Sequence, residues 1–245
     1  MTEALASTLT VDRPGYSLWS QVIGLDVPVL LVHHALGTFA GYSDPHLGNV
    51  AEWIVARGCR VVGFDLAGHG ASGGREFFPD AYLERSIADA QAVLDAAAVP
   101  TAAVVGIGFG GLVALNLAAS APRRVSCALV DSLPGIHDAI GPEPWPGLNE
   151  MGPRAGAAFG ETYRNYLAGL ARQPGYPYLA GRPHCPGLLV APGEADGPAA
   201  IALHEVARRA PSVAVAMVPG SAPPACWSAP RFFLLEAERF LAAYA

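Results

Sequence analysis

A glycine-rich turn in the middle of the chain constrains the fold more than any other feature. The stretch VVGIGFGGLVALNLA, residues 104–118, has the pattern of a buried strand, a sharp turn and a helix. Because a strand followed directly by a helix is the building unit of parallel sheets, this stretch predicts an α/β chain. The residue at the tip of the turn is Gly108, which has no side chain.

The rest of the chain repeats this alternation of short apolar runs and amphipathic segments. The pattern predicts strands at residues 27–33, 60–65, 101–106, 125–131, 187–191 and 213–218, and helices at residues 49–57, 79–97, 110–121, 161–172, 199–209 and 231–243. Near-continuous apolar runs are typical of parallel strands with helices on both faces. We therefore expect residues 1–245 to form one α/β domain with a doubly wound, mainly parallel sheet.

Residues 133–186 interrupt the alternation. This segment is rich in proline and glycine, which argues against regular strands and predicts a short lid insertion. Its aromatic residues, Trp145 among them, either line an apolar cavity or pack on the core.

The composition excludes several classes of function. The chain has 245 residues, 52% of them hydrophobic, and a formal net charge of -6. It has no basic run that could bind phosphates, so we expect no nucleic-acid partner. No apolar segment reaches the roughly 18 residues needed to cross a bilayer, so we expect no membrane association. The start of the chain lacks a secretory pattern and the four cysteines lack metal-ligand spacing, so we expect a cytoplasmic protein without a metal or cofactor.

The turn itself has two interpretations. GIGFGG fits the G-x-G-x-x-G pattern of dinucleotide-binding sites, but that pattern usually opens its domain, whereas earlier strands precede this turn. The alternative is the nucleophile elbow, G-x-S-x-G, in which Gly106 and Gly110 hold the flanking positions. Gly108 then stands at the position of the nucleophile.

Other stretches favour the elbow. Together with it, LLVHHALG, GFDLAGHGASGG and GLLVAPGEAD resemble the α/β-hydrolase superfamily over most of the chain, and the resemblance implies an α/β-hydrolase fold. It also implies that Asp196 holds the place of the triad acid, and Pro223 that of the histidine base. Since Gly108 and Pro223 lack the required chemistry, the chain also resembles non-hydrolytic members such as the N-myc downstream-regulated proteins.

The chemistry left to such a chain is the stabilisation of an anion. The resemblance implies an oxyanion site formed by the backbone N–H of Phe109 and by the loop near His34 and Ala35, with the substrate above Gly108. His34 replaces the usual glycine of that loop. We therefore select His34 as a candidate catalytic residue, together with Asp196.

Four further side chains have competing interpretations. His33 and Asp131 end predicted strands, where they either contact a substrate or support the scaffold. Cys226 and Trp227 lie in the loop that holds the base in the family. A Cys226 thiolate would be a relocated nucleophile, although a lone cysteine is more often a small buried hydrophobe.

The sequence thus predicts a non-hydrolytic enzyme, a lyase, cyclase or isomerase, that acts on an apolar carbonyl-containing small molecule. Two alternatives remain open. One is a non-catalytic small-molecule-binding or scaffold protein, and the other is a hydrolase with a relocated nucleophile. The sequence determines neither the substrate nor the oligomeric state.

Overall fold

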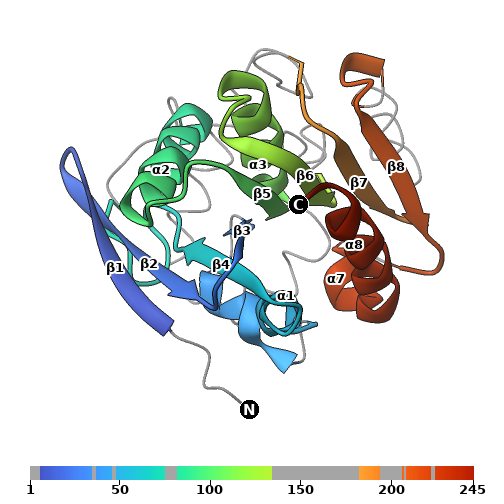
Figure 1. Ribbon diagram of the computed structural model, residues 1–245, viewed down its shortest axis with the longest axis horizontal. Helices are drawn as coiled ribbons and strands as arrows, with labels where there is room; N and C mark the ends of the chain where they lie inside the picture. Colours follow the sequence, from blue (N-terminus) through green and yellow to red (C-terminus); the bar gives the residue numbers. More distant parts are fainter. Residues whose placement is uncertain are drawn as a thin grey trace, which may run out of the picture.

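A single mixed sheet forms the centre of the molecule (Figure 1). The computed structural model describes residues 6–34, 37–45, 48–74, 82–133, 182–193, 206, 208–221 and 224–245. Within these residues eight strands lie in the order β1-β2-β4-β3-β5-β6-β7-β8. They are β1 (Ala6–Arg13), β2 (Tyr16–Ile23), β3 (Val27–Val32), β4 (Cys59–Phe64), β5 (Ala102–Ile107), β6 (Val125–Asp131), β7 (Gly187–Pro192) and β8 (Val213–Val218). Strand β2 is antiparallel to β1 and β4, and all other pairs are parallel.

Helices cover both faces of this sheet (Figure 1). On one face lie α2 (Tyr82–Ala96) and α3 (Phe109–Ser120), and on the other lie η1 (Phe39–Ser43), α1 (Val50–Val55), α7 (Ala225–Ser228) and α8 (Pro230–Tyr244). Each face of the sheet has its own hydrophobic core, and successive residues of a strand point into different cores. Leu30 packs with α2 and α3, and Leu31 packs with α1 and α8. The predicted doubly wound, mainly parallel fold is confirmed.

The hairpin of β1 and β2 was not predicted. Most β1 side chains are exposed, with Val11 the buried exception, so β1 has little apolar alternation. In β2 the inward residues are Leu18, Ser20 and Val22, and the polar member of this set weakens the period of two. The hairpin extends the sheet at the edge farthest from β8.

Some predicted segments lie outside the described residues. Almost all of the lid predicted at 133–186 is among them, including its helix at 161–172, and so is most of the helix predicted at 199–209. Among the helices that the structure does describe, none combines the length and the hydrophobicity needed to cross a membrane.

The sheet topology identifies one edge of the sheet as the expected place for a ligand. Strand β3 lies between β4 and β5, so the connections that leave β3 and β5 run in opposite directions. In open α/β sheets, ligands bind at such a switch point, beyond the carboxyl ends of the strands. Here β3 leads into His33 and His34, and β5 leads into Gly108, so these residues meet at that edge.

Candidate active site

The turn between β5 and α3 has the backbone conformation of a sharp elbow. Gly108 has φ 55° and ψ −116°, a conformation that side-chain-bearing residues rarely adopt. Its N–H donates to the carbonyl of Asp131 at 2.9 Å, and its own carbonyl accepts from the N–H of Gly111 at 2.9 Å. The turn is therefore fixed from both sides although it presents no side chain.

The flanking glycines are required by close packing. A Cβ on Gly106 would collide with the backbone carbonyl of Gly110, and a Cβ on Gly110 would collide with the carbonyl of Val32. The close approach of Gly106 to Gly110 allows the sharp turn of the elbow, and that of Gly110 to Val32 brings α3 close to the end of β3. The G-x-G-x-G pattern thus encodes this turn directly.

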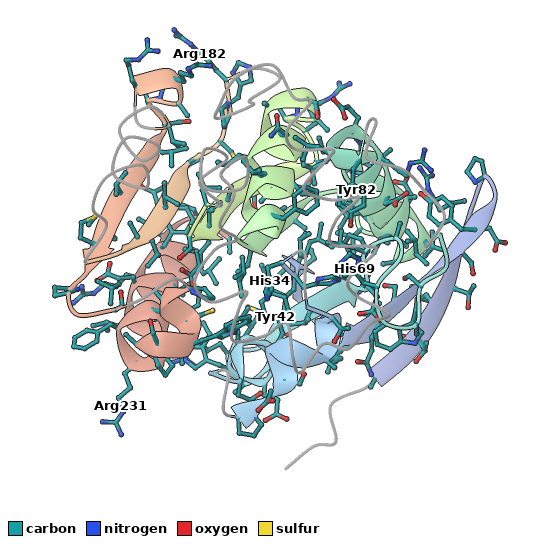
Figure 2. All side chains as sticks on the ribbon, turned by 180° about the vertical axis from the view of Figure 1, so that it is seen from behind. His34, Tyr42, His69, Tyr82, Arg182 and Arg231 are labelled. Atoms are coloured by element: carbon teal, nitrogen blue, oxygen red, sulfur yellow. The ribbon has the colours of Figure 1, made fainter. Side chains whose placement is uncertain are left out.

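His34 is the described residue nearest to the open position at Gly108. A Cβ built on Gly108 would lie 3.2 Å from the Cβ of His34. His34 is 7% exposed, and its ring meets the Trp227 ring edge-on, with centroids 4.9 Å apart. Burial, and secondarily the charge of His69, lowers the pKa of His34 to about 4, so the imidazole is neutral near pH 7. Figure 2 shows His34 in the middle of the molecule.

His33 is bonded to the scaffold through both ring nitrogens. Its Nε2 accepts from the N–H of Leu66 at 2.9 Å. Its Nδ1 must then carry the proton, which it donates to the carbonyl of His34 at 2.7 Å. Burial and then the charge of His69 hold the pKa of His33 well below its usual value. These bonds favour the structural interpretation of His33.

Asp131 is fully buried at the end of β6. Its Oδ1 accepts from the N–H of Ala225 and from the hydroxyl of Ser132, both at 2.9 Å, and its Oδ2 accepts from the N–H of Cys226 at 2.6 Å. Burial raises the pKa of Asp131, while these hydrogen bonds act in the opposite direction. The carboxylate therefore binds backbone N–H groups of the segment after β8, which favours a structural role over substrate contact.

Cys226 has no exposed surface. Burial, and then the neighbouring Asp131 carboxylate, raises the pKa of its thiol well above the usual value. Since the thiolate is the nucleophilic form, this environment opposes the idea of a relocated nucleophile.

Tyr42 is a part of the site that sequence analysis missed. It lies in η1, is buried, and donates its hydroxyl to the carbonyl of Val32 at 2.7 Å. Its pKa is raised by burial and then by Cys226 and Asp131, which places it in the same buried polar cluster. The only sequence signal for this role is that Tyr42 closely follows the HHALGT loop.

The side chain of Phe109 is buried in the core, so only its main chain is left for the predicted oxyanion site. It begins α3, and its ring stacks on Tyr82 in the core with centroids 5.0 Å apart. Ala35, Trp145, Asp196 and Pro223 lie outside the described residues, so their roles stay predictions. Within the described ranges, no three His, Cys, Asp or Glu side chains form a group that could hold a metal ion.

Comparison with known families agrees with this architecture. A family model described as "alpha/beta hydrolase fold" matches residues 28–181, which is more than half of the sequence. The chain belongs to the α/β-hydrolase fold family. Solved structures support the same fold for this α/β-hydrolase-fold protein. A probable hydrolytic enzyme from Pseudomonas aeruginosa PAO1 superposes with a TM-score of 0.74 at 17% identity, covering 96% of this chain and 93% of that one. An epoxide hydrolase from Vigna radiata superposes with a TM-score of 0.73 at 16% identity, covering 100% of this chain and 99% of that one.

Relatives with higher identity match a shorter region. The putative carbamate hydrolase RutD of Azorhizobium caulinodans is 37% identical over 108 residues, which are 44% of this chain and 38% of that protein. The rhodomycin D methylesterase DauP of Streptomyces sp. (strain C5) is 34% identical over 121 residues, 48% of this chain and 39% of that protein. The aligned region thus spans about two fifths of the length of these curated relatives.

Proposed function

We propose that this α/β-hydrolase-fold protein is a non-hydrolytic enzyme, a lyase, cyclase or isomerase, that acts on an apolar carbonyl-containing small molecule. The observation that carries the proposal is Gly108, where the elbow keeps its positive-φ conformation without any group that could attack a carbonyl carbon. The names of the relatives, a carbamate hydrolase and a methylesterase, both describe reactions at a carbonyl group.

The elbow suits the binding of an oxyanion. Gly108 is the N-cap of α3, a helix of 12 residues, and the amino end of a helix favours negative charge. A substrate carbonyl oxygen bound there is polarised, which makes the adjacent C–H group acidic. Because residue 108 cannot form an acyl enzyme, loss of that proton becomes the accessible reaction.

His34 is the residue that would take this proton. Its neutral imidazole removes the α-proton and becomes an imidazolium, while the substrate becomes an enolate whose negative charge lies on the oxygen. The neighbouring enolate raises the pKa of the imidazolium, which keeps the transferred proton in place. Return of the proton to another carbon completes an isomerisation, and its delivery to a leaving group completes an elimination. Asp196, the predicted acid, is the second catalytic candidate.

A non-catalytic binding protein is the second candidate function. It is favoured by the pKa of about 4 for His34, because an imidazole with so low a pKa is a weak base. The third alternative, a hydrolase that uses Cys226, is opposed by the burial and raised pKa of that thiol.

The proposal is tested by proton exchange on β-tetralone, an apolar ketone with acidic α-protons. We expect the protein to accelerate deuterium incorporation in heavy water, measured by proton NMR, and we expect His34→Phe to abolish the acceleration. His184→Phe is the matched control, because His184 is exposed and precedes β7, at the opposite edge of the sheet.

Each other result supports a different function. Saturation-transfer NMR that detects binding of β-tetralone without accelerated exchange would replace the enzyme with a binding protein. Covalent labelling of the wild-type protein by a fluorophosphonate probe would overturn the non-hydrolytic assignment, because it requires an activated nucleophile.

A further inference from the structure

Asp131 touches both walls of the candidate site. Its main-chain carbonyl accepts the N–H of Gly108 at 2.9 Å and so fixes the elbow. Its carboxylate accepts the N–H groups of Ala225 and Cys226 at 2.9 and 2.6 Å, and these are the first two residues of α7. One buried residue therefore links the turn after β5 to the loop after β8.

Helix α7 needs such an anchor. It has four residues, and the N–H groups of Trp227 and Ser228 both bond to the carbonyl of Pro224 at 3.2 Å. A single helical turn is not stable by itself, since nucleation costs more than one turn of hydrogen bonds returns. The position of α7 is therefore decided by the groups that hold it from outside.

The carboxylate of Asp131 is well built for this task. It has no exposed surface, and the Ser132 hydroxyl is a further donor at 2.9 Å. Ser132 has φ 57°, an uncommon value for a residue with a side chain, and this conformation accompanies the bond to its neighbour. Among the ion pairs of the described residues none includes Asp131, so hydrogen-bond donors, the Cys226 thiol among them, hold its charge.

Trp227 carries the effect of this anchor to His34. Its ring is half-buried and meets the His34 imidazole edge-on at 4.9 Å. The Cβ of His34 lies against the open position at Gly108. The contacts thus run from Asp131 through α7 and Trp227 to the imidazole beside the elbow.

We propose that Asp131 is a positioning residue that holds Trp227 against His34 and thereby sets the orientation of the imidazole beside Gly108. Its effect on catalysis rests on the proposed function, in which His34 transfers a proton. The anchoring itself does not depend on any reaction.

The anchoring is tested by Asp131→Asn, which keeps the size of the side chain. Asparagine has one accepting oxygen and presents an NH₂ group to the second backbone N–H, so one of the two anchoring bonds is lost. The matched control is Asp65→Asn. Asp65 is also buried, and each of its carboxylate oxygens also accepts one backbone N–H, from Phe39 and Ala71 at 2.8 Å.

The readout is fluorine NMR of protein labelled with fluorotryptophan, with the Trp227 resonance assigned by Trp227→Phe. We expect Asp131→Asn to move or broaden this resonance, and Asp65→Asn to leave it in place. His34→Ala should move the resonance in the wild-type protein and have no further effect in Asp131→Asn. A folded Asp131→Asn protein with an unchanged Trp227 resonance would overturn the proposal.

Two further measurements separate anchoring from function. In the wild-type protein the amide protons of Ala225 and Cys226 should exchange with solvent as slowly as those of β6, and rapid exchange would overturn the anchoring even if Asp131→Asn does not fold. If the wild-type protein exchanges the protons of β-tetralone, Asp131→Asn should slow this by about 100-fold, and a retained rate would overturn the catalytic effect. A wild-type protein without exchange would defeat the proposed function alone, because the NMR results still decide the anchoring.

Discussion

At the scale of single residues, the buried polar side chains around the elbow make several kinds of contact. His33, Asp65 and Asp131 bond to backbone groups through their side-chain nitrogen or oxygen atoms. The His34 imidazole packs edge-on against the Trp227 ring beside the elbow. Its low pKa is a consequence of burial, which links its protonation to the stability of the fold.

This linkage makes the contribution of His34 to stability depend on pH. Its pKa is about 4 in the folded protein, against an ordinary value of 6.5. Between these values the unfolded chain binds the proton more tightly, so the stabilisation is present above 6.5 and is lost as the pH falls toward 4. We expect wild-type protein to lose about 2 kcal/mol more unfolding free energy than His34→Phe between about pH 7.5 and about pH 5, measured by urea denaturation. Parallel pH profiles of the two proteins would contradict this expectation.

At the scale of structural elements, the glycines of the elbow have two different roles. Gly106 and Gly110 are required by close packing, whereas Gly108 leaves the site open. A methyl group on Gly106 meets the carbonyl of Gly110, a backbone atom that cannot move without shifting α3. A methyl group on Gly108 would make a tight contact with the His34 Cβ at 3.2 Å, and the positive φ of this residue is unfavourable for any side chain. The two positions therefore differ in how easily the structure can adjust.

We expect Gly106→Ala to be more damaging than Gly108→Ala. The first should lower the free energy of unfolding by more than about 4 kcal/mol or prevent folding, because it overpacks backbone against backbone. The second should cost about 1–3 kcal/mol, mainly through backbone strain. Thermal and urea denaturation measure both values, and the opposite order would show that the elbow is held by something other than this close approach.

The hairpin of β1 and β2 is joined to α2 by a buried polar clamp. Asp89 of α2 accepts from Arg13 Nε at 2.7 Å and from the Tyr16 hydroxyl at 2.7 and 2.9 Å. Asp89 has no exposed surface, and burial, followed by the hydrogen bond to Asp89 and then by its charge, raises the pKa of Tyr16 to about 12. Because β1 buries few side chains of its own, this clamp has a large share in holding the hairpin.

Removal of the Tyr16 hydroxyl should loosen the hairpin selectively. Tyr16→Phe keeps the ring but loses the bonds to a charged acceptor, which should cost about 1.5–3 kcal/mol of unfolding free energy. Hydrogen exchange should become faster in β1 and β2 than in β5. Tyr244→Phe, at a half-exposed ring in α8, is the control and should leave exchange in the hairpin unchanged. Equal acceleration in all three strands of Tyr16→Phe would show that the hairpin opens only with the whole sheet.

At the scale of the whole molecule, hydrophobic periodicity predicts strands β3 to β8 and helices α1, α2, α3 and α8, whereas the paths of the loops leave no such pattern in the sequence. His34, Gly108 and Asp131 were expected at one edge because they follow or end parallel strands, and the topology brings them together. The bond from Ala225 to Asp131 joins residues 94 positions apart through loops, whose course no hydrophobic period encodes. For the same reason η1 and its Tyr42 were not predicted.

The doubly wound sheet also leads us to expect that the two cores unfold cooperatively. Leu30 and Leu31 are adjacent in β3 and fully buried, but they belong to the two cores on opposite faces of the sheet. Each change to alanine should lower the free energy of unfolding by about 2–5 kcal/mol through lost burial and the cavity that remains. Both cores rest on the same strands, so either loss should shift one common transition. Trp19 and Trp53 pack against the core on the face of α1 and α8, so they contribute to tryptophan fluorescence. Far-UV circular dichroism and tryptophan fluorescence should therefore give coincident urea midpoints in both variants. Two separate midpoints in Leu30→Ala would instead mean that the layer with α1 and α8 persists after the layer with α2 and α3 has unfolded.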